Sequence, residues 1–129
     1  MNIWSHFRKA QPKPHNQSWP IIVGGFYRSG TSLLRRLLDG HSRIHCGPEV
    51  KFWRDFYSDY IDDDLKHLRF FKTARSLGLP EDQLLSIFGN AYVEFLEQAT
   101  RHHNKKRWAD KNPENLLYLR QWNQLLDEK

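Results

Sequence analysis

A glycine-rich segment between a short apolar run and an amphipathic stretch constrains the fold more than any other feature of this chain. Ile21–Val23 is a β-branched run after a proline, which predicts a buried strand. Gly30–Asp39 predicts a helix with leucines on one face and arginines on the other. A strand that leads through a glycine-rich turn into a helix is typical of α/β proteins with a parallel sheet. The apolar face of the expected helix consists of Leu33, Leu34, Leu37 and Leu38.

The turn itself has the spacing of a phosphate-binding loop. Counted from Gly25, the order is a glycine, four residues, a second glycine and two further positions. Thr31 stands where such loops carry lysine, and Arg28 supplies a positive charge in its place. Glycines let the backbone approach a ligand, and the N–H groups of a helix N-terminus point at it. We expect an anion site rather than an empty turn, formed by Arg28, Ser29, Gly30, Thr31 and Ser32.

The remaining segments continue the alternation of strands and helices. Ile44–Gly47 and Arg107–Lys111 predict two more strands, and the acids at 62–64 suit the first turn of a helix over 62–78. Pro80 opens a longer helix, and Asn112 is expected to cap a last helix whose first residue is a proline. The stripe expected to be buried on the longer helix is Leu84, Phe88, Ala91, Tyr92, Phe95 and Ala99.

These segments predict a P-loop-like parallel sheet flanked by helices. About three strands make a thin sheet for this class, so we expect an incomplete domain. Residues 1–20 are expected to form an extended arm, and residues 21–129 the N-terminal part of the domain. A next parallel strand is expected to pair with the first one, which would leave Ile21–Val23 at an exposed edge.

Composition excludes several classes of protein. Twenty Lys and Arg against 15 Asp and Glu give a formal net charge of +5, which favours an anionic partner. The single cysteine, Cys46, excludes an internal disulfide framework, and with His41 and His45 it makes a poor zinc site. No apolar run approaches the ~20 residues of a membrane span, and no signal peptide is recognisable. We therefore expect a cytoplasmic protein without a metal.

Three segments together resemble the sulfotransferases that use 3′-phosphoadenosine 5′-phosphosulfate (PAPS). They are Arg28–His41, Cys46–Glu49 and Trp108–Pro113. The resemblance is closest to the protein-tyrosine sulfotransferase branch, with its Arg-Ser-Gly-Thr-Thr-Leu, Cys-Gly-Glu-Glu and Lys-Asp-Pro elements. Pro48 and Asn112 depart from that pattern, because the branch has acidic residues at both positions.

The resemblance implies transfer of a sulfuryl group from PAPS to a hydroxyl acceptor, without a metal. The acceptor could be a protein tyrosine, a carbohydrate or a small molecule. The loop from Arg28 to Ser32 would hold the 5′-phosphosulfate, Glu49 would be the catalytic base, and Lys111 would lie near the bridging oxygen. The family holds the 3′-phosphate with a second element that has no counterpart in this sequence. We therefore expect the chain to lack that half, to be marginally soluble, and barely to distinguish adenosine 3′,5′-bisphosphate from adenosine 5′-phosphate.

Two other functions remain open at this stage. A magnesium-dependent, kinase-like P-loop protein could use Asp110 as the acidic residue of a magnesium site. A basic nucleic-acid-binding module could use the N-terminal arm and the cluster from Arg101 to Arg107. The acids are dispersed among the bases and no nucleic-acid-binding motif is present, so nucleic acid is not an expected partner. The aromatic residues that follow Glu49 could line an acceptor cleft or pack in the core: Phe52, Trp53, Phe56 and Tyr57.

Overall fold

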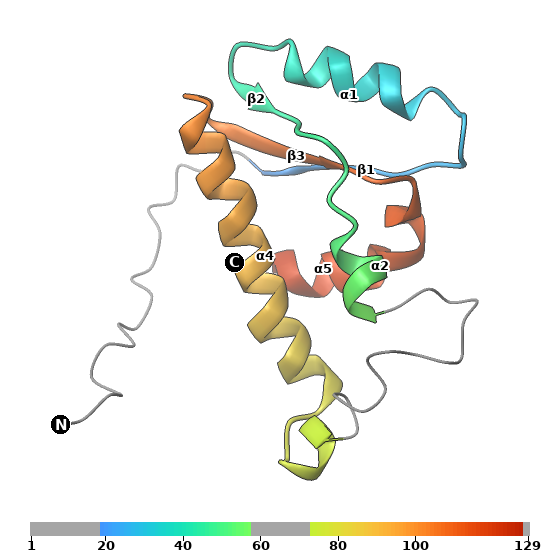
Figure 1. The fold of residues 1–129 in the computed structure, drawn as a ribbon, viewed down its shortest axis with the longest axis vertical. Coiled ribbons are helices and arrows are strands. Elements are labelled where there is room, and N and C mark those ends of the chain that lie inside the picture. Colours follow the sequence, from blue (N-terminus) through green and yellow to red (C-terminus); the bar gives the residue numbers. More distant parts are fainter. Residues whose placement is uncertain (1–18, 58–72, 128–129) are drawn as a thin grey trace, which may run out of the picture.

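Three short strands form a parallel sheet in the computed structural model, which describes residues 19–57 and 73–127 (Figure 1). The strands are β1 (Ile21–Val23), β2 (Ile44–His45) and β3 (Arg107–Lys111), in the order β1-β3-β2. Ile21 is opposite Ala109. The predicted α/β class is thus confirmed, and β1 is an edge strand of the described sheet.

Helices cover both faces of this sheet. On one side lies α1 (Thr31–Asp39), and on the other lie α2 (Phe52–Tyr57), α4 (Glu81–His102) and α5 (Leu119–Asp127), as Figure 1 shows. A short 3₁₀ helix, η2 (Pro113–Tyr118), joins β3 to α5. The helix expected over 62–78 lies largely outside the described residues. Within the described part of that range, residues 73–76 are helical.

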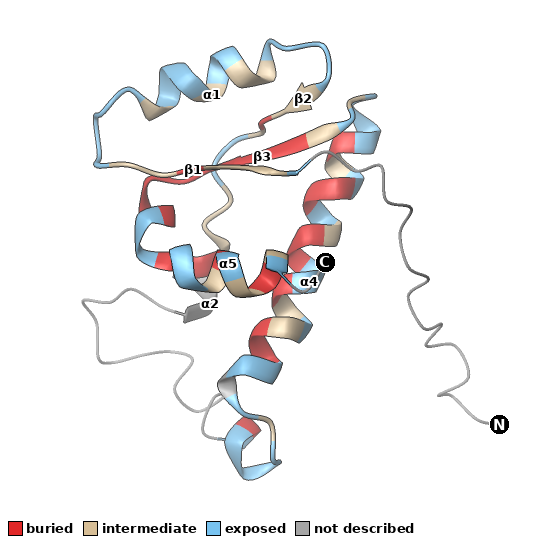
Figure 2. Ribbon diagram, turned by 180° about the vertical axis from the view of Figure 1, so that it is seen from behind, coloured by how far each residue is buried: buried red, intermediate tan, exposed pale blue. Residues whose placement is uncertain are grey.

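The core lies between the sheet and the helices of the second side, where Figure 2 shows most of the buried residues. Trp53 is its centre. Its ring meets that of Trp122 edge-on at 5.2 Å and stacks on that of Tyr118 at 5.9 Å. Phe52 stacks on Tyr92 at 4.3 Å, so the first two aromatic residues after Glu49 pack in and against the core. The buried members of the cluster are Trp53, Leu85, Tyr92, Val93, Leu96, Trp108, Tyr118, Trp122 and Leu125.

The expected apolar face of α1 is not a buried face. Leu33 and Leu37 are 63% and 65% exposed, and Leu34 is also exposed. Polar contacts to the turn after β2 set the orientation of the helix instead. Arg35 donates from Nη1 to the Cys46 carbonyl at 3.1 Å, and the Cys46 N–H donates to Asp39 Oδ1 at 2.9 Å. Because its N–H is held by Asp39, Cys46 lies outside β2, which is shorter than predicted.

The buried stripe of α4 is also rotated from the expected one. Leu84 and Tyr92 are buried as expected, but Ala91 and Phe95 are exposed. The helix instead turns the positions one residue further along, such as Val93, toward the core. Aromatic and aliphatic residues occupy more than one side of this helix, so its apolar residues alone do not fix which side packs.

Asn112 and Pro113 occupy the expected N-cap and first helical positions, but the side chain of Asn112 makes no capping hydrogen bond. Its side-chain amide donates to both oxygens of Asp110, at 3.1 and 2.9 Å. Only its backbone carbonyl accepts, from the N–H of Asn115 at 3.0 Å. Pro113 accordingly begins a 3₁₀ helix, and the α-helix starts at Leu119.

Asn115 connects four segments of the fold and is fully buried. Its amide donates to the carbonyl of Val23 at 2.9 Å and to Asp110 Oδ2 at 2.8 Å, and its Oδ1 accepts from Trp122 Nε1 at 3.0 Å. Among the described residues, Asn115 is the acceptor for the buried Trp122 Nε1, while the Val23 carbonyl and Asp110 Oδ2 also accept from Asn112.

We predict that Asn115→Ala lowers the free energy of unfolding by about 2–4 kcal/mol, because buried polar groups lose their partner. Denaturant unfolding followed by tryptophan fluorescence measures the change. Asn123→Ala is the matched control, since Asn123 is exposed and its side chain donates to Asp127 at 2.6 Å on the surface of α5. Its effect should stay within about 0.5 kcal/mol. Equal effects for the two variants would contradict the prediction.

Candidate functional site

The glycine-rich loop between β1 and α1 is attached to the chain that follows β3. The Gly25 N–H donates to the carbonyl of Pro113 at 3.2 Å. A Cβ at Gly24 would come within 2.9 Å of the backbone nitrogen of Leu116. Position 24 therefore requires glycine, because the loop passes directly over the backbone of η2.

The rest of the loop is open to solvent. Arg28 and Gly30 have left-handed backbone angles, with φ of 65° and 88°, so the chain turns tightly before α1 begins. Residues 28–30 and Ser32 are exposed and Thr31 is half-buried, and a Cβ at Gly30 would meet no atom within 4 Å. The first turn of α1 carries no acidic residue. The loop thus offers open space, helix N–H groups and a guanidinium, which together suit an anion.

Parallel strand pairing places this loop and Lys111 at the same side of the sheet, where the carboxyl ends of β1 and β3 lie. Val23, the last residue of β1, is opposite Lys111, the last residue of β3. The Asn112 N–H then donates to the Val23 carbonyl at 3.2 Å. The carboxyl ends of parallel strands are where ligands bind in open α/β sheets.

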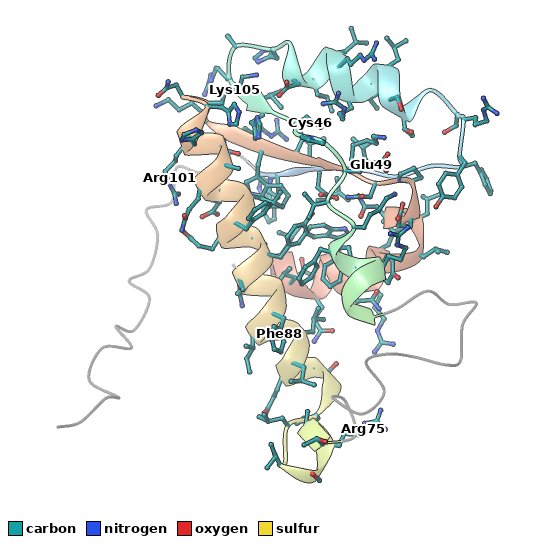
Figure 3. The ribbon with its side chains drawn as sticks, in the orientation of Figure 1. Cys46, Glu49, Arg75, Phe88, Arg101 and Lys105 are labelled. Atoms are coloured by element: carbon teal, nitrogen blue, oxygen red, sulfur yellow. The ribbon has the colours of Figure 1, made fainter. Side chains whose placement is uncertain are left out.

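Four side chains of alternating charge lie in a row at the carboxyl ends of the strands. We call them the charge chain: Lys111, Glu49, Lys51 and Glu114. Lys111 Nζ donates to Glu49 Oε1. Lys51 Nζ lies 2.7 Å from Glu49 Oε2 and 2.9 Å from Glu114 Oε1. Figure 3 shows Glu49 on the segment that follows β2, where it reaches the ends of the other strands. Lys111 and Glu114, the first and last residues of the charge chain, are buried, since their side chains are only 3% and 8% exposed.

The charge chain keeps Glu49 ionised. Partial burial acts to raise the pKa of Glu49, but the hydrogen bonds from Lys111 and Lys51 outweigh it and lower the pKa below the ordinary 4.5. Burial likewise acts to lower the pKa of Lys51, and its bonds to Glu49 and Glu114 more than reverse this. The site therefore holds a carboxylate and an ammonium in their charged forms at neutral pH.

Asp110 faces away from the loop, into the core. It is 3% exposed and accepts from the Tyr92 hydroxyl at 2.5 Å, besides the amides of Asn112 and Asn115. Burial raises the pKa of Asp110 more than these bonds lower it. A carboxylate whose oxygens are taken up by side chains of α4 and η2 is a structural group.

Cys46 is fully buried, and burial raises the pKa of its thiol to about 11. Such a thiol carries very little thiolate at neutral pH, so Cys46 is not a nucleophile. Its place in the structure is as a backbone donor to Asp39.

The structure brings some of the residues expected at the site into contact and leaves others apart. Glu49 and Lys111 are hydrogen-bonded across 62 residues of sequence. Within the described ranges, no hydrogen bond or ion pair joins Arg28 to either of them. Sequence reasoning missed Lys51 and Glu114. Their signal was their position, two residues after the expected base and three after the expected lysine.

A metal site and a membrane-spanning helix each place their own requirements on the described residues. Within residues 19–57 and 73–127, no group of three or more His, Cys, Asp or Glu side chains is placed to hold a metal ion. Over the same ranges, none of the helices combines the length and the apolar character needed to cross a membrane.

Several known proteins resemble parts of this chain. Protein-tyrosine sulfotransferase 1 of Danio rerio is 42% identical over 43 residues, which make up 33% of this chain and 12% of that protein. The protein-tyrosine sulfotransferase of Drosophila melanogaster is 45% identical over 38 residues, or 29% of this chain and 8% of that protein. A putative protein-tyrosine sulfotransferase of Caenorhabditis briggsae is 26% identical over 108 residues, or 77% of this chain and 32% of that protein.

The matched part of this chain spans less than a third of the length of each of these relatives. No solved structure matches it significantly. A family model described as the sulfotransferase family matches residues 20–127, which is most of the chain and includes the loop, Glu49 and Lys111. The chain belongs to the sulfotransferase family.

Proposed function

We propose that this chain binds the 5′-phosphosulfate end of PAPS and transfers its sulfuryl group to an acceptor hydroxyl. The observation that carries the proposal is the contact between Glu49 and Lys111, at the sheet edge from which the anion-binding loop starts. A base, a cation and an anion cradle are what sulfuryl transfer to a hydroxyl needs.

The loop fits the phosphosulfate group. Open space at Gly30, the N-terminal N–H groups of α1 and the exposed Arg28 are suited to a compact, multiply charged anion. When bound, PAPS would supply the sulfuryl group and a phosphate leaving group. The residues that would hold it are Arg28, Ser29, Gly30, Thr31 and Ser32.

The charge chain supports a division of roles at the reacting end. Glu49 is ionised and its side chain is 30% exposed, so its carboxylate can be reached by an acceptor hydroxyl and can accept the proton that the hydroxyl loses on attack. The sulfur–oxygen bond to the phosphate then breaks, and negative charge grows on that oxygen. Lys111 is buried at the end of β3 and is positioned to neutralise it. Tyrosine hydroxyls are the first acceptors to try, because the relatives are named as protein-tyrosine sulfotransferases.

The structural role of Asp110 argues against a magnesium-dependent kinase-like protein. Its oxygens accept hydrogen bonds from Tyr92, Asn112 and Asn115 and do not face the loop. Thr31 also replaces the lysine that phosphoryl transfer uses.

The basic cluster from 101 to 107 has partners within the protein. Arg101 Nη2 lies 2.9 Å from Glu94 Oε1, and Lys105 Nζ lies 3.5 Å from Asp39 Oδ1. Arg107 donates to the Trp19 carbonyl. A nucleic-acid-binding surface needs basic groups free to meet phosphates, and these three are already engaged.

Calorimetric titration distinguishes these functions. We expect adenosine 3′,5′-bisphosphate to bind equally well with and without magnesium, and ATP to bind more weakly. Incubation with radiolabelled PAPS and a tyrosine-containing acidic peptide then tests transfer. ATP binding that depends on magnesium would support the kinase-like function instead. A protein that binds no nucleotide but binds RNA with a steep salt dependence would be a nucleic-acid-binding module.

A further inference from the structure

Lys51 is shared between two carboxylates. Its Nζ lies 2.7 Å from Glu49 Oε2, and 2.9 and 3.1 Å from the two oxygens of Glu114. One ammonium thus forms ion pairs with two carboxylates, and it donates a hydrogen bond to Oε2 of Glu114. The Lys51 ammonium is therefore paired both with Glu49, the expected base, and with Glu114. Glu114 belongs neither to the sequence motifs nor to the proposed chemistry.

Each oxygen of Glu49 already has a lysine partner in this arrangement. Oε1 accepts from Lys111 and Oε2 lies against Lys51. An acceptor hydroxyl must share one of these oxygens with a lysine, and the more tightly that lysine binds, the less basic the oxygen is. Lys111 is buried at the end of β3, whereas Lys51 has a second carboxylate within reach.

Glu114 is well placed to be that second carboxylate. It is the second residue of η2, directly after the β3 end that carries Lys111, and its side chain is 8% exposed. A buried carboxylate is costly unless it is paired, so Glu114 strongly favours keeping the Lys51 ammonium.

We propose that Glu114 is a positioning residue that holds the Lys51 ammonium and so controls how tightly Lys51 binds Oε2 of Glu49. This inference rests on the proposed role of Glu49 as base. With Lys51 held by Glu114, Oε2 can be released to the acceptor hydroxyl. Without Glu114, Lys51 has Glu49 as its only carboxylate partner among the described residues and binds Oε2 fully.

The charged groups around Glu49 give the sign of each change. They are Lys51 from the same segment, Lys111 from β3 and, beyond Lys51, Glu114 from η2. The negative charge of Glu114 also raises the pKa of Asp110 of β3. Loss of Glu114 leaves the whole ammonium to Glu49, which lowers the pKa of Glu49. Loss of Lys51 removes a cation from Glu49, which raises its pKa.

The test is an NMR titration of the Glu49 side-chain carboxyl carbon in ¹³C-glutamate-labelled protein, with the signal assigned by its absence in Glu49→Gln. We expect the midpoint of Glu49 to move to lower pH in Glu114→Gln and to higher pH in Lys51→Met. In the double variant the midpoint should stay where Lys51→Met alone puts it, because Glu114 acts through Lys51. Glu94→Gln, a change of the same charge on the outer side of α4, should leave it unmoved.

Glu114→Asp serves as a second variant should Glu114→Gln fail to fold. It keeps the charge but withdraws the carboxylate by one methylene, so the midpoint should move in the same direction by less. An unmoved midpoint in the Glu114 variants, or a shift that persists in the Lys51→Met background, overturns the proposal.

The titration needs neither donor nor turnover, so its outcome is separate from that of the proposed function. In protein active in the transfer assay, Glu114→Gln should lower kcat, leave the KM for PAPS within about 2-fold, and move the acidic limb of the pH–rate profile with the NMR midpoint. A fall in folded protein alone would change neither the midpoint nor the limb.

Discussion

Glu49→Gln is expected to lower the rate of sulfuryl transfer by about 10²–10⁴-fold, the range for loss of a positioned general base. The substitution keeps the shape of the side chain and one oxygen to accept from Lys111, but it removes the basic carboxylate. Affinity for the donor should change little, because Glu49 lies at the reacting end and the loop holds the phosphosulfate. Single-turnover kinetics with saturating PAPS measures the chemical step.

The control for this prediction is Glu94→Gln. Glu94 is a paired carboxylate on α4, 2.9 Å from Arg101, and no described hydrogen bond or ion pair joins it to the charge chain. The rate of this variant should stay within about 2-fold of the unchanged protein. Should Glu49→Gln turn over as fast as Glu94→Gln, Glu49 would be an ordinary ion-paired residue.

The pH dependence follows from the direction of the shift. Since its lysine partners hold the pKa of Glu49 below 4.5, the base form persists as the pH falls to that value. The contribution of its ion pairs to stability is present above the unfolded-state pKa and is lost as the pH falls through the lower, folded-state pKa. The acidic limb of the rate profile should therefore lie below pH 4.5 in the unchanged protein.

Local patterns predicted the elements of this fold better than they predicted the packing. The β-branched run at Ile21–Val23 and the strand at Arg107–Lys111 have the predicted bounds. The leucines of α1 face outward because Arg35 and Asp39 bind the Cys46 backbone, a tertiary contact that periodicity does not contain. Asn112 turns its side chain to Asp110, two residues away, because the nonlocal packing of Tyr92 and Asn115 buries that carboxyl.

The site shows the same division between local and nonlocal information. A resemblance in three short segments was enough to select Glu49 and Lys111, and the structure joins them. Lys51 and Glu114 lie beside those motifs, and each taken alone is an ordinary charged residue. Only the fold, which carries the chain after β2 across the end of β3, turns them into partners.

Arg28→Ala is expected to reduce turnover by about 10²–10³-fold, the range for loss of one preorganised charge donor. The described structure shows no carboxylate paired with Arg28, so its guanidinium is available to an incoming anion. Its backbone is already left-handed, with φ of 65°, and alanine meets the same constraint there. The substitution therefore tests the charge without relaxing the loop.

Arg36→Ala is the matched control, since Arg36 is an exposed arginine at the other end of α1 and its loss changes the net charge equally. Calorimetry with adenosine 3′,5′-bisphosphate should show weaker binding for Arg28→Ala, and the loss should shrink as salt rises because the contact is exposed. Arg36→Ala should bind as the unchanged protein does. If both variants lose affinity equally, the loop draws the anion through general charge alone; a loss confined to Arg28 locates the recognition at the turn that leads into the helix N-terminus.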